Sequence, residues 1–247
     1  SIDENIPHVL IGDPVRLFKN SGTTSIFAIM NSYFVRTPWW LRRLYPSRLW
    51  SVDTDENIIY LTFDDGPHPE ATTFVLDKLK EYGARATFFC IGKNVIAHPA
   101  IYSRIVEEGH AVGNHTQQHL NGWKTKDKIY LNDVREAAKY IDSDLFRPPY
   151  GRITTFQAKH ISNAMQRKDA KIVMWDVISG DFDHSISNEQ CLQQVILNAS
   201  KGSIVVFHDS EKAFKRLQFS LPHVLDFFGK KGFRFESLRA EEKGITQ

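Results

Sequence analysis

Short apolar runs alternate with helix-like segments through most of this chain. The runs are rich in β-branched and aromatic residues and cover residues 58–63, 86–91, 111–114, 145–148, 171–177, 203–208 and 233–237. Such runs, bounded by turn residues, are typical of buried strands. Between them, apolar side chains recur at helical spacing in residues of about 72–82, 94–108, 130–142, 155–168, 188–200 and 217–231. Seven strands alternating with helices predict a parallel sheet, closed as a barrel or left open and doubly wound.

Two adjacent acids end the first predicted strand. The apolar run at residues 58–63 stops at Asp64 and Asp65, and the strand-breaking pair Gly66-Pro67 follows. Neighbouring carboxylates repel each other, so a fold that keeps both at one strand end usually holds a cation beside them. The alternative is an ordinary turn in which the two acids are solvated or bond the backbone.

Polar and titratable residues also follow the later strands. They are His115 and His119 after the third run, Arg147 and Tyr150 at the end of the fourth, Asp181 after the fifth and His208 at the end of the sixth. In a parallel barrel the C-terminal ends of all strands open onto one face, which carries the active site. This placement predicts that the groups share one functional site.

His115 and His119 are four residues apart. If this segment forms a helical turn, both imidazoles lie on one face and can share a metal ion. With a carboxylate from another strand end, they make a two-histidine, one-carboxylate set that leaves coordination positions open for water. The alternative is a pair of surface histidines at a spacing that also arises by chance.

Residues 31–50 interleave aromatic residues with arginines. The aromatic residues are Tyr33, Phe34, Trp39, Trp40, Tyr45 and Trp50, and the arginines are Arg36, Arg42, Arg43 and Arg48. The pattern fits a membrane-surface or sugar-stacking patch. It also fits a lead-in that packs its rings over one end of the core. We favour packing, because Pro38 and Pro46 break any long amphipathic helix.

The composition fits one globular α/β domain. A chain of 247 residues that is 42% hydrophobic and 24% charged is neither disordered nor fibrous, and a single α/β barrel of this length is ordinary. The net charge of +2 gives no argument for a nucleic-acid partner, which needs a concentrated basic face. Cys90 ends an apolar run and is expected to be a buried, inert thiol. Together with Cys191 it does not make a disulfide framework.

The chain has no predicted membrane span and no recognisable signal peptide. A span needs ~18 consecutive apolar residues, and the nearest candidate, the run from Ile26 to Met30, is far shorter. Because the chain begins at Ser1 rather than Met, the lack of a signal peptide leaves export open.

Five motifs follow one another along the chain. They are Thr62-Phe63-Asp64-Asp65-Gly66, His115-Thr116-Gln117-Gln118-His119, Arg147-Pro148-Pro149-Tyr150-Gly151, the stretch from Trp175 to Asp183, and Val206-Phe207-His208. Together they resemble the NodB-type polysaccharide deacetylase family (carbohydrate esterase family 4) over roughly residues 57–240. The resemblance implies a distorted (β/α)7 barrel at residues 57–247, a single catalytic domain, preceded by an N-terminal extension and lead-in at residues 1–56. It also implies a divalent metal, most often Zn²⁺, with Co²⁺, Ni²⁺ or Mn²⁺ as alternatives.

The residue chemistry and the resemblance together assign roles to the first two motifs. Asp65, His115 and His119 would hold the metal, which polarises the acetyl carbonyl and the attacking water. Asp64 would be the general base. Arg147 would hold Asp64 in place and ionised, although it could also be a structural ion-pair partner.

The later motifs receive roles in the same way. By resemblance, the backbone N–H of Tyr150 helps stabilise the tetrahedral oxyanion. His208 would be the general acid that protonates the departing sugar nitrogen, and Asp181 would orient it and favour its charged form. Alternatively, Asp181 simply terminates a strand and His208 is a satisfied core histidine. His110, which opens a strand, is expected to be structural.

Two positions depart from the family pattern. The fourth motif usually reads Asp-x-x-Asp-Trp, whereas the matching residues here are Ile178, Asp181 and Phe182. The fifth motif usually has Leu where this chain has Val206. We expect these changes to alter the shape of the substrate site rather than the reaction. Trp175 could line the groove or fill the barrel, and we favour the barrel.

The expected function is that of a metal-dependent hydrolase acting on an acetylated glycan. It would remove acetyl groups from the N-acetylated amino sugars of peptidoglycan, chitin-like oligomers or poly-N-acetylglucosamine, and the resemblance places it in the cell envelope or outside the cytoplasm. Alternatives are an O-acetyl esterase on a polysaccharide such as xylan and a non-catalytic glycan-binding relative. A non-haem iron oxygenase uses the same ligand types, but its usual β-rich scaffold fits poorly with seven βα repeats.

Overall fold

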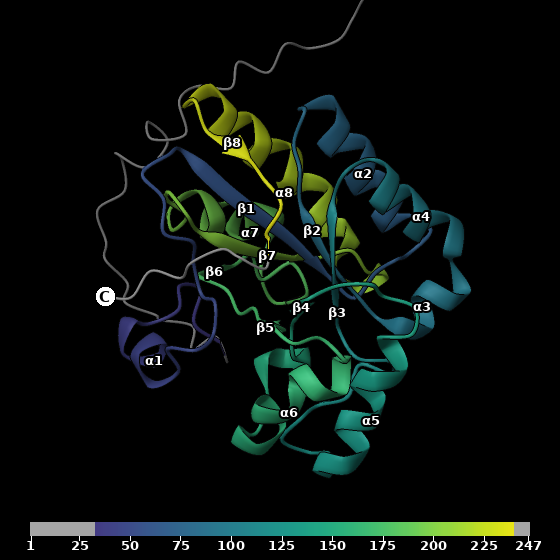
Figure 1. The fold of residues 1–247 in the computed structure, drawn as a ribbon. Helices are drawn as coiled ribbons and strands as arrows, with labels where there is room; N and C mark the ends of the chain where they lie inside the picture. The colour runs from purple at the N-terminus through teal and green to yellow at the C-terminus, as the bar shows by residue number, and fades with distance from the viewer. Residues whose placement is uncertain (1–32, 240–247) are drawn as a thin grey trace, which may run out of the picture. The chain divides into compact units, whose positions relative to one another are not determined.

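The fold is organised around one long, fully buried strand, β1 (Ile58–Asp64). In this computed structural model, which describes residues 33–239, β1 pairs in parallel with β2 (Thr87–Cys90) on one side and β7 (Ile204–His208) on the other. The strand order is β5-β4-β3-β2-β1-β7-β6, and β8 (Arg234–Phe235) pairs with the start of β1 (Figure 1). The other strands are β3 (Ala111–Asn114), β4 (Leu145–Phe146), β5 (Lys171–Ile172) and β6 (Val177–Ile178).

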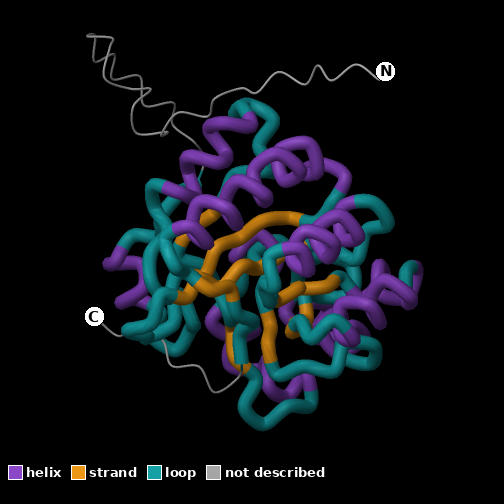
Figure 2. The backbone as a smooth tube through the Cα atoms, turned by 90° about the horizontal axis from the view of Figure 1, so that it is seen from above, coloured by secondary structure: helices purple, strands orange, loops and turns teal. Residues whose placement is uncertain are grey.

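Helices surround this parallel sheet, as Figure 2 shows. They are α1 (Trp39–Leu44), α2 (Ala71–Glu81), α3 (Gly92–Ala97), α4 (Pro99–Glu107), α5 (Asp127–Ala137), α6 (Thr155–Met165), α7 (Asn188–Ile196) and α8 (Glu211–Lys230). The predicted helix at 94–108 is two helices, because Pro99 lacks the N–H that would continue the first. The predicted distorted (β/α)7 barrel is confirmed as a curled parallel sheet with helical crossovers.

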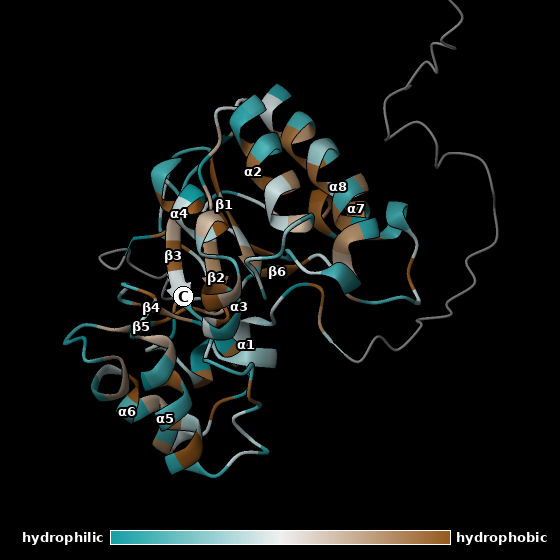
Figure 3. Ribbon diagram, turned by 90° about the vertical axis from the view of Figure 1, so that its right-hand side faces the viewer, coloured by the Kyte–Doolittle hydropathy of each residue, from teal (hydrophilic) through white to brown (hydrophobic). Residues whose placement is uncertain are grey.

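Side chains of β1 alternate between two apolar environments. Ile59, Leu61 and Phe63 belong to the large hydrophobic cluster that α2, α7 and α8 cover, whereas Ile58 and Tyr60 belong to a second cluster inside the curl of the sheet. Successive strand residues point to opposite faces. The alternation therefore continues through Thr62 to Asp64, which faces the interior. In Figure 3, helices such as α2 and α8 mix brown with teal, as expected of helices with one buried and one exposed face.

The barrel is closed by a short irregular crossing rather than by a strand pair. β5 and β6 lie at opposite edges of the sheet, and residues 173–176 between them cross the gap. The prediction of a single strand at 171–177 is therefore wrong. At one end of the crossing Val173 N–H donates to Phe146 O in β4, and at the other end Asp176 N–H donates to Ile204 O in β7. One continuous strand does not reach both edges of this sheet.

The segment upstream of β1 fills the remaining opening in the barrel wall. Leu49 N–H donates to Ile172 O at 2.9 Å and Leu49 O accepts from Met174 N–H at 2.7 Å. Closer to the N-terminus, Ile178 N–H donates to Val35 O at 2.9 Å. Residues 1–32 of the predicted lead-in, including the run from Ile26 to Met30, and residues 240–247 of the predicted barrel domain lie outside the described residues. The boundary at 56/57 stays a prediction.

The aromatic lead-in packs only in part. Trp50 is buried as expected, but Phe34, Trp39, Trp40 and Tyr45 are exposed. The physical reason is that α1 is short and turns Arg42 toward the barrel. Within residues 33–239, no helix is both long and apolar enough to cross a membrane. The two cysteines are buried and unpaired, which confirms the inert thiol predicted for Cys90.

Two glycines allow a matched test of packing in the sheet. A Cβ added to Gly113 in β3 would lie 2.4 Å from Phe89 Cδ1, whereas one added to Gly229 near the end of α8 would meet nothing within 4 Å. We expect Gly113→Ala to lower the free energy of unfolding by about 1–3 kcal/mol through overpacking. Gly229→Ala should raise it by up to about 1 kcal/mol. Urea denaturation measures both, and equal small changes would contradict the close packing at Gly113.

Candidate active site

Asp64 and Asp65, at the end of β1, contact different partners. Asp64 is the last residue of β1 and is 4% exposed. Asp65 leaves the strand with φ of 84°, a left-handed conformation that residues other than glycine seldom adopt. Asn94 Nδ2 fixes this turn by donating a hydrogen bond to Asp65 O at 2.7 Å.

Arg147 holds Asp64 from across the barrel. It is fully buried and donates from Nη1 to Asp64 Oδ1 at 2.7 Å and to Thr62 Oγ1 at 2.8 Å. Its Nη2 donates to Met174 O at 2.8 Å, and its guanidinium lies 4.1 Å from the centre of the Phe89 ring. Burial lowers the pKa of Arg147, while the charge of Asp64 acts in the opposite direction. Asp64 is therefore fixed by a buried, charge-assisted hydrogen bond.

The two predicted histidines meet without a helical turn. Residues 115–121 form an irregular loop, in which Thr116 and His119 have φ of 65° and 57°. The helical turn considered for this segment does not form, yet the ring centroids of His115 and His119 are only 5.1 Å apart. Nδ1 of His115 lies 2.7 Å from Arg147 O, so Nδ1 carries the ring proton and donates a hydrogen bond to this carbonyl, and Nε2 is left as the unprotonated nitrogen. Burial lowers the pKa of His115 to about 4, which keeps the ring neutral.

Two polar side chains keep this loop in shape. Asn114 Oδ1 accepts the N–H of Thr116 at 2.8 Å, and Asp133 Oδ2 from α5 accepts the N–H groups of Gln117 and Gln118 at 2.9 Å each. The left-handed residues are held by these bonds rather than by helical spacing. Sequence analysis missed Asp133, since its partners are distant along the chain and no motif includes it.

Asp65, His115 and His119 form a group that fits a metal ion. Their ligand atoms all lie within 4.8 Å of one another, and Asp65 Oδ1 lies 3.1 Å from Nε2 of His119 and 3.6 Å from Nε2 of His115. Asp65 Oδ1 is buried without a hydrogen-bond partner. Burial raises the pKa of Asp65, but the nearby imidazoles, His119 first and then His208 and His115, lower it by more. A charged, unsatisfied oxygen beside two Nε2 atoms fits a divalent cation.

His208 and Asp181 form a tight pair on the opposite side of β1. His208 ends β7 in register with Asp64, and its Nδ1 lies 2.8 Å from Asp181 Oδ1. Its backbone N–H also donates to Asp181 Oδ2 at 2.7 Å. Burial alone would lower the pKa of His208, but Asp181, followed by Asp65 and Asp64, raises it to about 9. The ring is therefore charged at neutral pH and its Nε2–H is available to donate.

Tyr150 sits in a strained turn beside the histidines. Its φ of 60° and ψ of 10° interrupt the short 3₁₀ segment Pro149–Gly151. The ring is exposed, and its centroid lies 4.7 Å from that of His119. Within the described part of the chain, the Tyr150 N–H donates to no other group. Gly151 follows with φ of 66°, and a Cβ there would meet the Trp175 ring at 2.6 Å.

The flanks of the site carry Trp175 and Phe182. Trp175 is half-buried, with its ring 5.9 Å from the guanidinium of Arg147, and it packs against the apolar cluster inside the curl of the sheet, as favoured from the sequence. Phe182 meets His208 edge-on at 5.1 Å, and Lys212 Nζ lies 5.8 Å from the Phe182 ring. The phenyl ring at position 182 thus contacts the imidazole directly.

A buried acid that sequence analysis missed braces the Asp65 turn. Asp209 is fully buried, and its carboxylate accepts the N–H of Gly66 and the hydroxyl of Thr72. A Cβ at position 66 would lie 2.1 Å from Asp209 Oδ2, so only glycine fits there. Burial raises the pKa of Asp209 to about 8. In the sequence, the position of Asp209 directly after His208 is the feature that could have marked it as a site residue.

All the predicted site residues lie at the C-terminal ends of the strands. They come from β1, β3, β4, β6 and β7 and are Asp64, Asp65, His115, His119, Arg147, Tyr150, Asp181 and His208. His110 instead opens β3, where it is buried and accepts the Ala86 N–H on Nδ1 at 3.2 Å. Burial lowers the pKa of His110 to about 4, as expected of a structural histidine.

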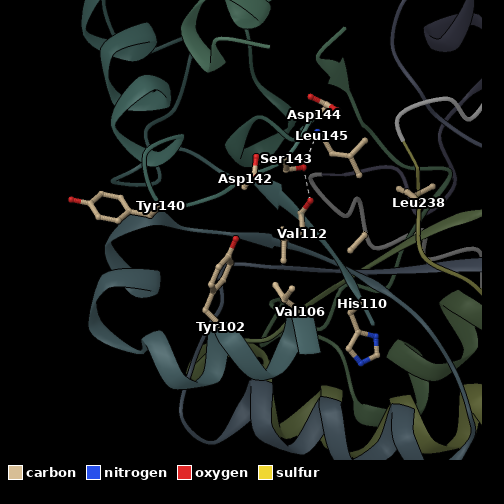
Figure 4. Close-up of a pocket in the computed structure, with 11 residues that line it drawn as sticks. Tyr102, Val106, His110, Val112, Tyr140, Asp142, Ser143, Asp144, Leu145 and Leu238 are labelled. Atoms are coloured by element: carbon tan, nitrogen blue, oxygen red, sulfur yellow. Dashed lines mark hydrogen bonds between the residues drawn. The ribbon is translucent and has the colours of Figure 1, made fainter. Parts of the chain in front are cut away.

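A hollow of about 510 Å³ lies at the other end of β3 and β4 (Figure 4). Tyr102 from α4 and Tyr140 flank it, and Asp142 and Asp144 stand on its rim. Both acids form ion pairs with the same arginine, Arg167, which offsets part of their negative charge. Because the metal-ligand group lies at the C-terminal strand ends, this hollow is separate from it.

The brace made by Asp209 leads to a stability and metal-binding prediction. Asp209→Ala leaves the hydroxyl proton of Thr72 and the N–H of Gly66 without an acceptor. We expect it to lower the free energy of unfolding by about 2–4 kcal/mol. Because the Asp65 turn loosens, metal affinity should fall roughly 10- to 100-fold. Denaturation and metal titration measure the two effects. Asp226→Ala, at an exposed surface pair with Lys230, is the control. Unchanged metal affinity in Asp209→Ala would show that the brace does not position Asp65.

Comparison with known proteins agrees with this geometry. The family model described as "Polysaccharide deacetylase" matches residues 51–170. A peptidoglycan-N-acetylglucosamine deacetylase of Bacillus cereus is 35% identical over 192 residues, covering 75% of this chain and 88% of its own. A chitooligosaccharide deacetylase of Azorhizobium caulinodans is 33% identical, covering 64% and 76%.

Solved structures give the same assignment. A peptidoglycan N-acetylglucosamine deacetylase in complex with 4-naphthalen-1-yl-N-oxidanyl-benzamide matches with a TM-score of 0.75 at 29% identity, covering 85% of this chain and 99% of its own. The peptidoglycan deacetylase PdaC from Bacillus subtilis matches with a TM-score of 0.66 at 27% identity, covering 76% of this chain and 90% of its own. From its motifs, its fold and these relatives, the chain belongs to the NodB-type polysaccharide deacetylase family, carbohydrate esterase family 4.

Proposed function

We propose that this protein hydrolyses the acetamide group of N-acetylglucosamine units in a peptidoglycan-type glycan, with Zn²⁺ as its metal. The observation that carries the proposal is the fixed carboxylate of Asp64, held by Arg147 beside the Asp65–His115–His119 group. The relatives named above support deacetylation of N-acetylated amino sugars. Peptidoglycan is favoured over chitin-like oligomers because peptidoglycan deacetylases recur among the relatives.

Asp65, His115 and His119 would hold the metal through one carboxylate oxygen and two Nε2 atoms. Their arrangement and the deacetylase family support a divalent ion, and a set of one Asp and two His fits Zn²⁺ with positions left open. When bound, such an ion supplies a Lewis acid for the acetyl carbonyl and the attacking water. Arg147 O orients His115 by accepting a hydrogen bond from its Nδ1–H, as expected for a ligand imidazole.

Asp64 is the proposed general base. Arg147 occupies its Oδ1, which leaves Oδ2 to accept a proton from water as the water oxygen attacks the carbonyl carbon. The electron pair of the C=O bond moves onto the carbonyl oxygen. The free N–H of Tyr150 is the proposed donor to this oxyanion, and one such donor contributes about 3–4 kcal/mol in other hydrolases.

His208 is the proposed general acid. Asp181 binds its Nδ1, so the Nε2 proton is the one given to the sugar nitrogen as the C–N bond breaks. The products are acetate and a free amino sugar. An amine leaves only after protonation, whereas the alcohol of an acetyl ester leaves more readily without it. A charged His208 therefore favours amide hydrolysis over the O-acetyl esterase alternative.

Acetate release from a substrate panel tests this proposal. The panel comprises peptidoglycan, chitooligosaccharides and acetylated xylan, and the protein is stripped of metal and assayed with and without Zn²⁺ or Co²⁺. We expect metal-dependent release from peptidoglycan and a loss of at least about 100-fold in Asp64→Asn, because the base is gone. Asp64→Asn should still bind one equivalent of metal. If no member of the panel releases acetate although metal is bound, a non-catalytic glycan-binding protein is favoured. If only acetylated xylan releases acetate, an esterase is favoured.

The pairing of His208 with Asp181 predicts a shift in pH dependence. The acid must be protonated, so activity falls as the pH rises through the pKa of His208, which Asp181 raises. Asp181→Asn lowers that pKa, and the alkaline limb of kcat should move to lower pH by about 1–2 units. Asp226→Asn removes a carboxylate on the surface of α8 and should leave the limb in place. An unmoved limb in Asp181→Asn would contradict the role of His208 as the acid.

A further inference from the structure

The short helix α1 presents an exposed apolar face. This α1 face consists of Phe34, Trp39, Trp40, Arg43 and Leu44, and its apolar members are 46–69% exposed. Positions three and four apart are neighbours on a helix, which joins Trp39 to Arg43 and Trp40 to both Arg43 and Leu44. The Phe34 ring extends the face, since it meets Trp40 edge-on at 6.4 Å. In Figure 1, α1 stands at the edge of the domain.

The opposite side of α1 is fastened to the barrel. Arg42 points inward, forms an ion pair with Asp176 and donates to Ser51 Oγ and Thr37 O, both at 3.3 Å. Asp176 is buried and also accepts the hydroxyl of Ser203 at 2.6 Å. The buried carboxylate of Asp176 thus holds α1 against the barrel, which fixes the position of the two exposed tryptophans.

The segment that carries the α1 face contains basic residues but no acidic ones. Residues 33–50 contain four arginines and no acidic residue. Arg43 is exposed and forms no ion pair within residues 33–239. The Arg36 side chain is 55% exposed, although its Nε lies 3.5 Å from Asp176 Oδ1. The Arg48 guanidinium lies 4.0 Å from the centre of the Tyr45 ring. The exposed surface therefore combines cations with aromatic and aliphatic side chains.

We propose that the α1 face docks on an anionic phospholipid surface. Tryptophan favours the level of the lipid headgroups, arginine attracts anionic phosphates, and Leu44 and Phe34 can enter the acyl boundary. A sugar-binding platform would use the flat aromatic rings but would leave Leu44 in water. The small area of the face makes the binding reversible and dependent on lipid charge. This proposal is independent of the reaction at the strand ends.

Vesicle binding of the full 247-residue chain tests the proposal. The probes are vesicles of equal parts phosphatidylglycerol and phosphatidylcholine, compared with phosphatidylcholine alone. We expect co-sedimentation with the anionic vesicles, weakened by 0.5 M salt as charges are screened. Trp40→Ser/Leu44→Ser and Arg43→Glu should each weaken partitioning by about tenfold or more. Matched controls are Leu197→Ser, at an exposed leucine on the C-terminal side of α7, and Lys128→Glu on α5; both should bind as the parent does.

Quenching of tryptophan fluorescence by brominated lipid locates the contact. Quenching should drop in the double variant Trp39→Phe/Trp40→Phe. It should persist in Trp123→Phe, because Trp123 is 64% exposed but does not belong to the α1 face. Thermal unfolding and acetate release check that each variant is folded. Equal binding to neutral vesicles, unchanged binding of the α1 variants, or quenching that persists without Trp39 and Trp40 would each overturn the proposal. Self-association through this face in place of lipid binding, seen by sedimentation, would do the same.

Discussion

The buried ion pair between Arg147 and Asp64 is the interaction on which the active end of the barrel depends. Arg147 reaches from β4 to β1 and to the crossing segment at Met174, so it ties together three parts of the wall. Its carbonyl also sets the tautomer of His115. Loss of either charge would strand the other in the interior, which typically destabilises a protein by about 3–5 kcal/mol. Stability and chemistry therefore share one side chain.

Much of this arrangement could be predicted from the sequence, because strand ends are marked by a change from apolar to polar residues. The acids after β1 and the histidine that ends β7 stand out in this way, and parallel topology brings such ends together. Strand alternation then places Asp64 and His208 on the inner face. Ile58 and Tyr60 in β1 and Ile204 in β7 are an even number of residues away from them and line the interior.

What could not be predicted depends on contacts between distant residues. The loop at His115 and His119 looks helical in spacing, but Asp133 on a later helix holds its backbone in another shape. The brace from Asp209 to Thr72 and Gly66 joins residues more than a hundred positions apart. The predicted strand at 171–177 is broken because its two ends pair with opposite edges of the sheet. The position of these edges depends on the whole barrel and cannot be read from the local sequence pattern.

The bridging role of residues 34–52 bears on how the protein can be shortened. The family model begins to match at residue 51, so trimming to that point would remove Val35 and Leu49. Val35 hydrogen-bonds β6, and Leu49 hydrogen-bonds β5 and the crossing segment at Met174. It would also remove Arg42 and leave Asp176 buried with one charge and no cation. At its N-terminal end, the part of the chain needed for an intact barrel therefore extends beyond the residues that the family model matches.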